Sequence, residues 1–522
     1  MSSPALPVAP PASEELVALE RRLCDPRGSV EDLAATAAAV RSFAWSEHAR
    51  REAWVNRRAL AAGLSVATLG RLAPVLVEPP GEAAEETVWL DLAALGEKLV
   101  AVLDSGAEAA SESGSSVWLV GGMVRDLLLG LPPGDPDLLV LGNEEAFCSS
   151  LARRLGAEQR PNHRFRTTKL ALDGGQVVDV AGVRAEAYPE PAALPAVLEG
   201  GVFADLFRRD FSVNTLLVPL AGPARGLVVD LLGGLADLAD RHLRPLHGMS
   251  FVDDPTRIYR ALRFERSRDL RLTTEGRRWM RWSIDCGYAG LLSPARLRAD
   301  LVKLCRRIGE VPRVVERLID ERLPPFAFIR RPIKVESARP LETLSRFLST
   351  PELAAELGAS GESLHGEKQG AWRLFLTCAT LLTPSQETLA FADRSGERHL
   401  IDRLRSRVDD LAAALRQPRV PLSRLLDLTS GCSAAEVVAA AALLGPREPP
   451  RLAALLEARR TAASAEIRGQ DLIDLGYSPG PAIGQALAEV ERAIADGEIS
   501  APEALEYGAR LVERSRRKGG GG

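Results

Sequence analysis

The sequence lacks the marks of a membrane, secreted or zinc-binding protein. No apolar run reaches the roughly 18 residues that a membrane-spanning helix needs. The opening residues, MSSPALPVAPPAS, carry neither the charged segment nor the apolar segment of a secretory signal. The six cysteines stand singly, without a CxxC pair, so we expect reduced thiols in a cytoplasmic protein.

Common phosphate-chemistry signatures are missing as well. Neither GxGxxG nor GxxxxGK[ST] occurs, which excludes the dinucleotide-binding and P-loop motifs. None of the six histidines is followed by aspartate, so the metal-binding His-Asp pair of an HD-type phosphohydrolase is absent. With a net charge of −4 and a pI near 6.0, no global basic field points to a nucleic-acid partner. A local surface lined with arginine remains possible on an acidic protein.

What is present is a long chain whose character changes along its length. At 522 residues it predicts three or four domains. Aromatic residues make up only 5% whereas Leu, Ala and Val abound, a composition that suits packed helices. Strand-like runs mix with helical ones up to about residue 245, and the pattern is almost wholly helical afterwards. The predicted divisions are an N-terminal helical extension (1–86), an α+β head (87–245), a helical neck (246–310), a helical body (311–450) and a helical tail (451–522).

Within the predicted head, the apolar patterns indicate individual elements. Short apolar runs predict strands at 117–122, 135–141, 167–173, 176–181 and 227–231. Helical spacing predicts helices at about 87–104, 123–129, 144–155 and 211–219.

The first chemically informative stretch is VWLVGGMVRDLLLGLPPGDPDLLVLG, residues 117–142. Paired glycines such as Gly121 and Gly122 allow a triphosphate to approach backbone N–H groups. Asp135 and Asp137 at i and i+2 on a strand share one face, and such carboxylates can hold two Mg²⁺ ions for in-line attack on an α-phosphate. Either feature alone is more often a plain turn or a pair of surface aspartates. Both together at this spacing favour nucleotidyl transfer.

Pro136, between the two aspartates, lacks a backbone donor. It therefore predicts that this strand lies at a sheet edge or contains a bulge.

Two further stretches combine arginine with aspartate. DLFRRDFSVNTLLVPL, residues 205–220, places Arg209 and Asp210 before an apolar run, where they could take a phosphate and a ribose hydroxyl. FVDDPTRIYRALRF, residues 251–264, puts Asp254, Arg257 and Arg260 at helical spacing. In isolation, each is more often a capped or salt-bridged helix.

At these three stretches, in this order, the sequence resembles the class II tRNA nucleotidyltransferase/poly(A) polymerase family. The text is similar to that family's GGxVRDxLLG…DxD, RRDFTxNAL and EDPxRxxRaxRF motifs. The resemblance covers about 87–310 well and 465–510 recognisably. Between 311 and 464 it rests on helicity and order, and 1–86 fall outside it.

The resemblance implies both a fold and an activity. The fold would be α+β, a polymerase-β-like nucleotidyltransferase head with a mixed sheet, followed by an all-helical neck, body and tail. The activity would be addition of C, C and A to the 3′ end of tRNA from CTP and ATP, with Mg²⁺ as cofactor and pyrophosphate as product. It would need neither a nucleic-acid template nor a membrane, and the tail would bind tRNA.

The resemblance also assigns roles to matching positions. Asp135 and Asp137 would bind the metals, and Asp179 stands where a third carboxylate would sit on a neighbouring strand. Triphosphate and ribose would contact Gly122, Arg125, Arg209 and Asp210. The nucleobase or phosphates would face Asp254, Arg257 and Arg260, joined by Arg263.

Base selection has a direct physical interpretation at Asp254 and Arg257. A carboxylate accepts from the exocyclic amino group that cytosine and adenine carry and uracil lacks, and Arg can donate to a ring nitrogen of either base. Uracil would set its carbonyl oxygen against the carboxylate.

Alternatives remain open. A poly(A) polymerase, or an enzyme adding only CC or only A, would share these motifs, although family poly(A) polymerases tend to be strongly basic. A nucleotide-binding regulatory module without activity is disfavoured because both motif aspartates are present.

Overall fold

The computed structural model describes residues 88–327, 340–359, 368–382, 421–429, 434–444 and 467–519, with scattered residues between 18 and 39 and between 398 and 457. The chain forms two compact units, residues 1–292 and 293–522. The first contains every motif described above.

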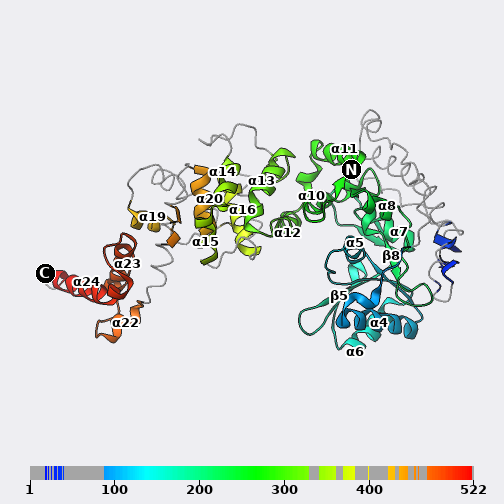
Figure 1. The fold of residues 1–522 in the computed structure, drawn as a ribbon, viewed down its shortest axis with the longest axis horizontal. Helices are drawn as coiled ribbons and strands as arrows, with labels where there is room; N and C mark the ends of the chain where they lie inside the picture. Colours follow the sequence, from blue (N-terminus) through cyan, green and yellow to red (C-terminus); the bar gives the residue numbers. More distant parts are fainter. Residues whose placement is uncertain are drawn as a thin grey trace, which may run out of the picture. The chain divides into compact units, whose positions relative to one another are not determined.

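The first unit is built on a six-stranded mixed sheet (Figure 1). The strand order is β3-β4-β5-β2-β1-β8, and only β2 and β5 run parallel. The bounds are Ser116–Val120 (β1), Asp137–Leu141 (β2), Glu158–Asn162 (β3), Thr167–Ala171 (β4), Val177–Gly182 (β5) and Leu217–Pro219 (β8). The expected α+β head with a mixed sheet is confirmed.

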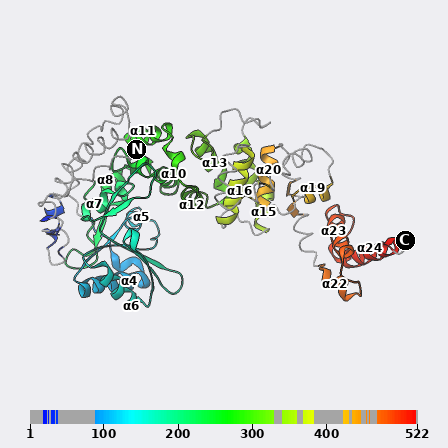
Figure 2. The same ribbon diagram turned by 180° about the vertical axis from the view of Figure 1, so that it is seen from behind.

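Two helices cover one face of this sheet. α4 (Glu97–Ser113) and α6 (Glu144–Leu155) lie side by side against it, as both ribbon views show (Figure 2). Leu138, Leu170 and Val180 point to this face and are at most 1% exposed. Asn143 caps α6 by accepting a hydrogen bond from the Ala146 N–H at 3.0 Å.

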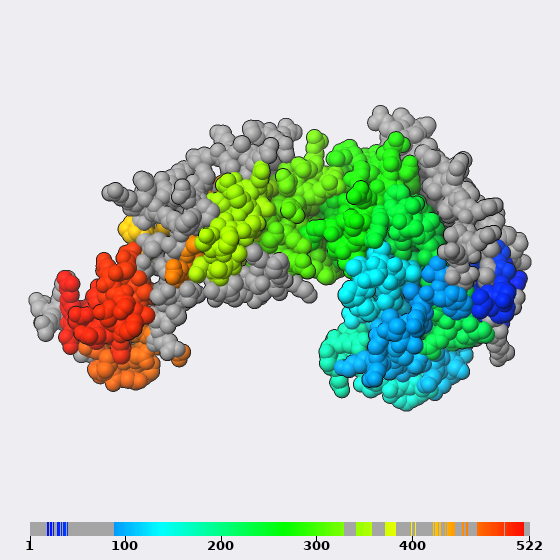
Figure 3. Space-filling view, in the orientation of Figure 1, coloured from blue at the N-terminus to red at the C-terminus, as the bar shows by residue number. Residues whose placement is uncertain are grey.

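Among the described residues, part of the opposite face is covered. Trp118 and Leu139 pack there against α7 (Val202–Phe207). Leu33 and Ala37 of the N-terminal extension are buried in the same core, at 6% and 7% exposure, and Figure 3 shows the described N-terminal residues against the head. The described part of the extension therefore contributes to the core of the first unit.

The rest of the first unit is mostly helical and includes two small sheets. Its elements are β6 (Ala185–Ala187), β7 (Ala196–Leu198), α8 (Gly234–Ala239), β9 (His242–Leu243), α9 (Ser250–Asp253), α10 (Thr256–Arg268), β10 (Arg271–Leu272) and α11 (Thr274–Asp285). β6 pairs with β7, and β9 with β10.

The second unit is helical in all its described segments. Its α-helices are α12 (Pro294–Leu304), α13 (Val311–Asp320), α14 (Pro340–Leu348), α15 (Pro351–Ala359), α16 (Lys368–Leu382), α19 (Leu422–Thr429), α20 (Ala434–Leu444), α22 (Gly469–Asp474), α23 (Pro481–Ala495) and α24 (Ala504–Gly519). Ser293 caps α12, and Pro294 occupies its first turn, a favourable position for proline. Of the helices that the structure describes, none combines the length and the apolar character of a membrane span.

Several predicted elements differ from those observed. The helix predicted at about 87–104 is shifted along the chain, because α4 starts at Glu97, after Gly96 at φ 83°, and ends at Ser113. Residues 88–90 are extended instead and form hydrogen bonds with the 226–228 segment. The predicted helix at 211–219 is a single 3₁₀ turn, η3 (Ser212–Asn214), followed by β8, because pairing with β1 outweighs the local helical pattern. Residues 227–231 form isolated bridges only.

The prediction that Pro136 marks an edge strand or a bulge is wrong. β2 lies between β5 and β1 and begins at the next residue, so the missing donor falls before the ladder. The carbonyl of Pro136 still accepts a 3.0 Å hydrogen bond from the Asp179 N–H.

Candidate active site

Two carboxylates lie side by side on the central parallel strands. Asp137, the first residue of β2, is the register partner of Asp179 on β5. Partners on adjacent strands point to the same face and lie about 4.8 Å apart. Asp135 is exposed on the bend that leads into β2. The structure thus brings the proposed third carboxylate next to Asp137.

This carboxylate pair suits a divalent cation. Burial raises the pKa of Asp137 to about 6 and the charge of Asp179 adds to the rise, while Arg209, Lys169 and the Gly122 N–H oppose it. In the described parts of the chain, no three His, Cys, Asp or Glu side chains are grouped closely enough to hold a metal by themselves. Mg²⁺ is commonly held by one or two carboxylates together with substrate phosphates. Asp137 and Asp179 therefore fit a Mg²⁺ ion that binds together with a nucleotide.

The glycine pair forms the turn between β1 and α5 (Gly122–Leu128). Gly121 has φ 80° and ψ −137°, a backbone conformation that residues with a Cβ avoid. A Cβ there would stand 3.1 Å from Asp137 Oδ2 and 3.3 Å from Arg209 Nη1. Glycine is thus required for the carboxylate and the guanidinium to approach this turn.

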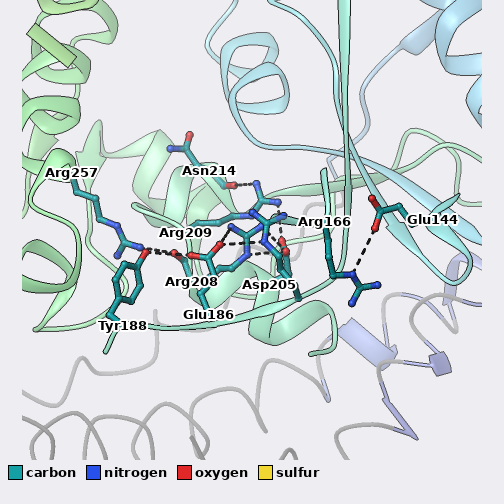
Figure 4. Close-up of polar contacts among 10 residues, drawn as sticks. Glu144, Arg166, Glu186, Tyr188, Asp205, Arg208, Arg209, Asn214 and Arg257 are labelled. Atoms are coloured by element: carbon teal, nitrogen blue, oxygen red, sulfur yellow. Dashed lines mark hydrogen bonds and ion pairs between the residues drawn. The ribbon is translucent and has the colours of Figure 1, made fainter. Parts of the chain in front are cut away.

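Arg209 reaches this turn because a buried carboxylate holds it. Its Nη2 donates to Asp205 Oδ2 at 2.9 Å, and its Nη1 donates to the Asn214 carbonyl at 3.3 Å. Asp205 has no exposed surface and also accepts two bonds from Arg208 (Figure 4). The Nε of Arg209 is buried without a hydrogen-bond partner among the described residues. The hydrogen bonds to Asp205 and Asn214 thus hold the Arg209 guanidinium beside Gly121.

Arg125 is placed differently from what a triphosphate ligand requires. It is only 4% exposed, and its guanidinium bonds to Asp126 and donates to Asn214 Oδ1 at 2.5 Å. The guanidinium also lies 4.6 Å from the centre of the Phe264 ring. In this structure Arg125 ties α5 to η3 and α10, and its triphosphate contact stays a prediction.

Asp210 joins the same network from the other side. Its Oδ1 accepts from the Phe211 N–H at 2.9 Å and from Asn214 Nδ2 at 2.7 Å. Its Oδ2 accepts from Arg260 Nε on α10 at 2.6 Å. Burial opposes ionisation, but the charge of Arg260 and the hydrogen bonds from Asn214 and Arg260 lower the pKa of Asp210 to about 2. Sugar recognition by Asp210 stays a prediction.

The proposed base-reading residues lie at the junction of α9 and α10. Asp254 ends α9, and its Oδ1 accepts from the backbone N–H and the hydroxyl of Thr256. Arg257 is 4% exposed and donates to Ser250 Oγ at 2.7 Å and to the Arg208 carbonyl at 2.6 Å. Figure 4 shows Arg257 beside Tyr188 and Arg208. Arg263 lies with Arg260 beside the Phe264 ring. These contacts fix the start of α10 against the RRD segment and leave base reading untested.

Known proteins match this part of the chain. Residues 117–244 match the poly A polymerase head domain. The chain is 37% identical over 207 residues to an A-adding tRNA nucleotidyltransferase of Geobacter sulfurreducens, covering 40% of this chain and 24% of that protein. It is 40% identical over 145 residues to a CC-adding tRNA nucleotidyltransferase of Deinococcus radiodurans, covering 28% of this chain and 39% of the relative.

A solved structure extends the likeness over most of the chain. The Thermotoga maritima CCA-adding enzyme complexed with tRNA shares 25% identity and superposes with a TM-score of 0.62, covering 82% of this chain and 100% of that chain. Residues 117–244 therefore belong to the poly A polymerase head family, and the chain is similar to tRNA nucleotidyltransferases. The sequence matches nevertheless span well under half the length of the two curated relatives.

Within this poly A polymerase head domain, the sequence analysis missed residues that hold the site together. The role of Asp205 could have been predicted, because this residue precedes Arg208 by three residues and Arg209 by four, a spacing that allows ion pairs on one helical turn. Asn214 bridges Arg125 and Asp210, and only the fold reveals that role. Lys169, bonded to Asp179 at 2.9 Å, is recognisable only once β4 is paired with β5.

Proposed function

We propose that this protein adds nucleotides to the 3′ end of tRNA without a nucleic-acid template, placing C, C and A from CTP and ATP and releasing pyrophosphate. The observation that carries the proposal is the pairing of Asp137 with Asp179 beside the Gly122 N–H and Arg209. The tRNA substrate is supported by the likeness to proteins whose names place them on tRNA.

The side chains divide the work of nucleotidyl transfer. Asp137 and Asp179 would hold Mg²⁺ together with the substrate phosphates, and Asp135 would join them on the bend before β2. When bound, Mg²⁺ polarises the α-phosphate and neutralises charge on the transferring group. Arg209, held by Asp205, would take the triphosphate through the guanidinium that lies beside Gly121. Gly121 and Gly122 let the phosphates approach the backbone.

Base selection is assigned to Asp254 and Arg257. The carboxylate would accept from the amino group of cytosine or adenine and repel the uracil carbonyl. Arg257 would donate to the ring of either base, and its contacts with Ser250 and the Arg208 carbonyl fix it at the start of α10. Arg260 and Arg263 on the same helix would complete this side of the pocket.

The second candidate function is a partial reaction. An A-adding and a CC-adding relative both match part of the chain, so addition of A alone or of CC alone is supported by specific relatives. Poly(A) addition shares the same chemistry and is disfavoured by the pI near 6.0.

One experiment separates these activities. Purified protein is incubated with tRNA lacking its last three nucleotides, and with tRNA ending in CC, supplying CTP, ATP or both, and the products are sequenced. We expect CC with CTP alone, A on the CC-ended tRNA with ATP, and CCA with both. Addition confined to one of the two tRNAs would assign a partial reaction, and long A tracts would assign poly(A) synthesis.

A further inference from the structure

A row of charged residues crosses the sheet at the level of the carboxylates. Asp137 on β2 is the register partner of Asp179 on β5, Asp179 of Lys169 on β4, and Lys169 of Arg160 on β3. Register partners share a face of the sheet. Two anions are therefore followed by two cations on one face, from the centre of the sheet to its edge.

This face is accessible where the cations lie. The side chains of Lys169 and Arg160 are both 63% exposed, and that of Asp179 is 39% exposed. The neighbouring residues Thr168 and Leu170 are buried on the opposite face. The row thus lies on the side of the sheet away from α4 and α6.

Both cations have partners that a phosphate could replace. Lys169 Nζ lies 2.9 Å from Asp179 Oδ1, and Arg160 Nη2 lies 2.8 Å from Glu158 Oε2. Ion pairs between exposed side chains contribute little to stability, so exchanging the carboxylate for an RNA phosphate is cheap. Phosphate contacts of this kind are independent of sequence, as a shared tRNA end requires.

The direction of the row matches the geometry of the reaction. The groups suited to the triphosphate lie at the Asp137 end of the row: the Gly122 N–H donates to Asp137, and the Arg209 guanidinium lies with Asp137 beside Gly121. In an in-line displacement the attacking hydroxyl stands opposite the leaving pyrophosphate. The RNA 3′ hydroxyl would then approach from the Asp179 end, where Lys169 and Arg160 continue the row.

We propose that Lys169 and Arg160 bind backbone phosphates of the last nucleotides of the RNA and lead its 3′ end to Asp137 and Asp179. This inference rests on the proposed function, because it takes RNA as the nucleotide acceptor. The ligand is a single-stranded RNA backbone, bound without reading its bases.

Arg160→Ala and the double variant Lys169→Ala/Arg160→Ala test this surface. The dissociation constant for tRNA lacking its last three nucleotides is measured over a range of salt, without nucleotide. We expect the double variant to bind about tenfold more weakly at low salt and to lose about 1.4 from the slope of log K against log salt, at about 0.7 per single-strand phosphate contact. Arg160→Ala, two strands from Asp179, should show about half of the change in slope and leave the KM for CTP unchanged.

The matched control is Arg153→Ala. Arg153 is 68% exposed and ion-paired to Glu112 at 2.9 Å, but it lies on α6, behind the sheet. It should bind RNA like the wild type. Unchanged affinity and salt slope in the double variant, or an equal loss in Arg153→Ala, would overturn the proposal. Nucleotide addition by the wild type, measured in parallel, reports separately on the proposed function.

Discussion

At the scale of single residues, Asp210 is a buried carboxylate that its hydrogen-bond partners keep ionised. Its carboxylate collects hydrogen bonds from Phe211, Asn214 and Arg260, which belong to the RRD segment and to α10. Those interactions lower its pKa to about 2 although burial opposes ionisation. The ionised form therefore stabilises the junction between the sheet and α10.

This lowered pKa predicts a pH dependence of stability. Because the pKa of Asp210 is lower in the folded than in the unfolded chain, its contribution is present above about pH 4 and is lost as the pH falls towards 2. The shift corresponds to roughly 2 kcal/mol, about half of which should be gone at pH 3. Denaturant unfolding of the wild type and Asp210→Asn at pH 5 and pH 3 measures it. A stability difference that does not shrink with pH would contradict the assignment.

Base choice is the residue-scale question closest to specificity. If Asp254 accepts from the amino group of the base, Asp254→Ala should let UTP compete, and discrimination should fall by roughly 10- to 150-fold, as for a lost charged hydrogen bond of about 1.5–3 kcal/mol. Arg257→Ala should slow CTP and ATP incorporation together. It should also destabilise the fold, because Arg257 is 4% exposed and bonds to Ser250 and the Arg208 carbonyl.

The measurement is the CTP:ATP:UTP incorporation ratio on tRNA lacking its CCA end, with unfolding curves for each variant. Unaltered ratios in folded protein would show that these two residues serve only the structure of the α9–α10 junction.

At the scale of elements, the turn from β1 into α5 brings the head's groups together. Gly121→Ala should place a methyl group against Asp137 and Arg209 in a conformation unfavourable for alanine. We expect a loss of stability of about 1–3 kcal/mol and a fall in turnover of at least about tenfold.

Gly130→Ala is its control. Gly130 also has a positive φ, 70°, but a Cβ there would meet no atom within 4 Å. It should lose stability while keeping its turnover. Equal turnover in the two alanine variants would show that the close approach of Asp137 and Arg209 to Gly121 does not affect turnover.

Strands and helices that carry strong local patterns could be predicted from the sequence. β1, β2, β4 and β5 and helices α5 and α6 lie close to their predicted positions. β3, with the sequence EQRPN, was missed because all five of its residues are exposed and no hydrophobic alternation marks it. β8 was mistaken for helix because its pairing with β1 is a long-range contact that a local window does not contain.

The same limit applies to the site. The GG and DxD patterns and the later RRD segment predict Asp137 and Arg209 as site residues, and Asp179 is predicted from its place on a neighbouring strand. Sequence spacing could not reveal that Arg125 points into the core, nor that Lys169 bonds to Asp179, because both depend on which strands and helices become neighbours.

At the scale of the whole molecule, the C-terminal helices of the second unit pack on one another around apolar side chains. Leu472, Val490 and Val512 are buried among α22, α23 and α24. The basic run Arg514-Ser-Arg-Arg-Lys518 lies within α24. This segment is far in sequence from every nucleotide motif, which fits the predicted role of residues 451–522 in binding tRNA.

Deleting residues 467–522 should therefore weaken tRNA binding more than nucleotide binding. Phosphate contacts would make the loss depend on salt. The measurement compares the dissociation constants for tRNA and for CTP in the full chain and the deletion variant. Equal tRNA affinity of the two proteins over the whole salt range would show that residues 467–522 do not contribute to tRNA binding.

The central claim is that this protein transfers nucleotides to tRNA with a metal held by Asp137 and Asp135, at and just before the start of β2. It is tested most directly by incorporation of radiolabelled CTP and ATP into tRNA lacking its CCA end, comparing the wild type with Asp137→Asn and Asp135→Asn. The account predicts incorporation by the wild type and at least about a 10³-fold loss in each folded variant, because an anionic metal ligand is removed. Substantial turnover by both variants at saturating Mg²⁺, or no incorporation by the wild type, would contradict it.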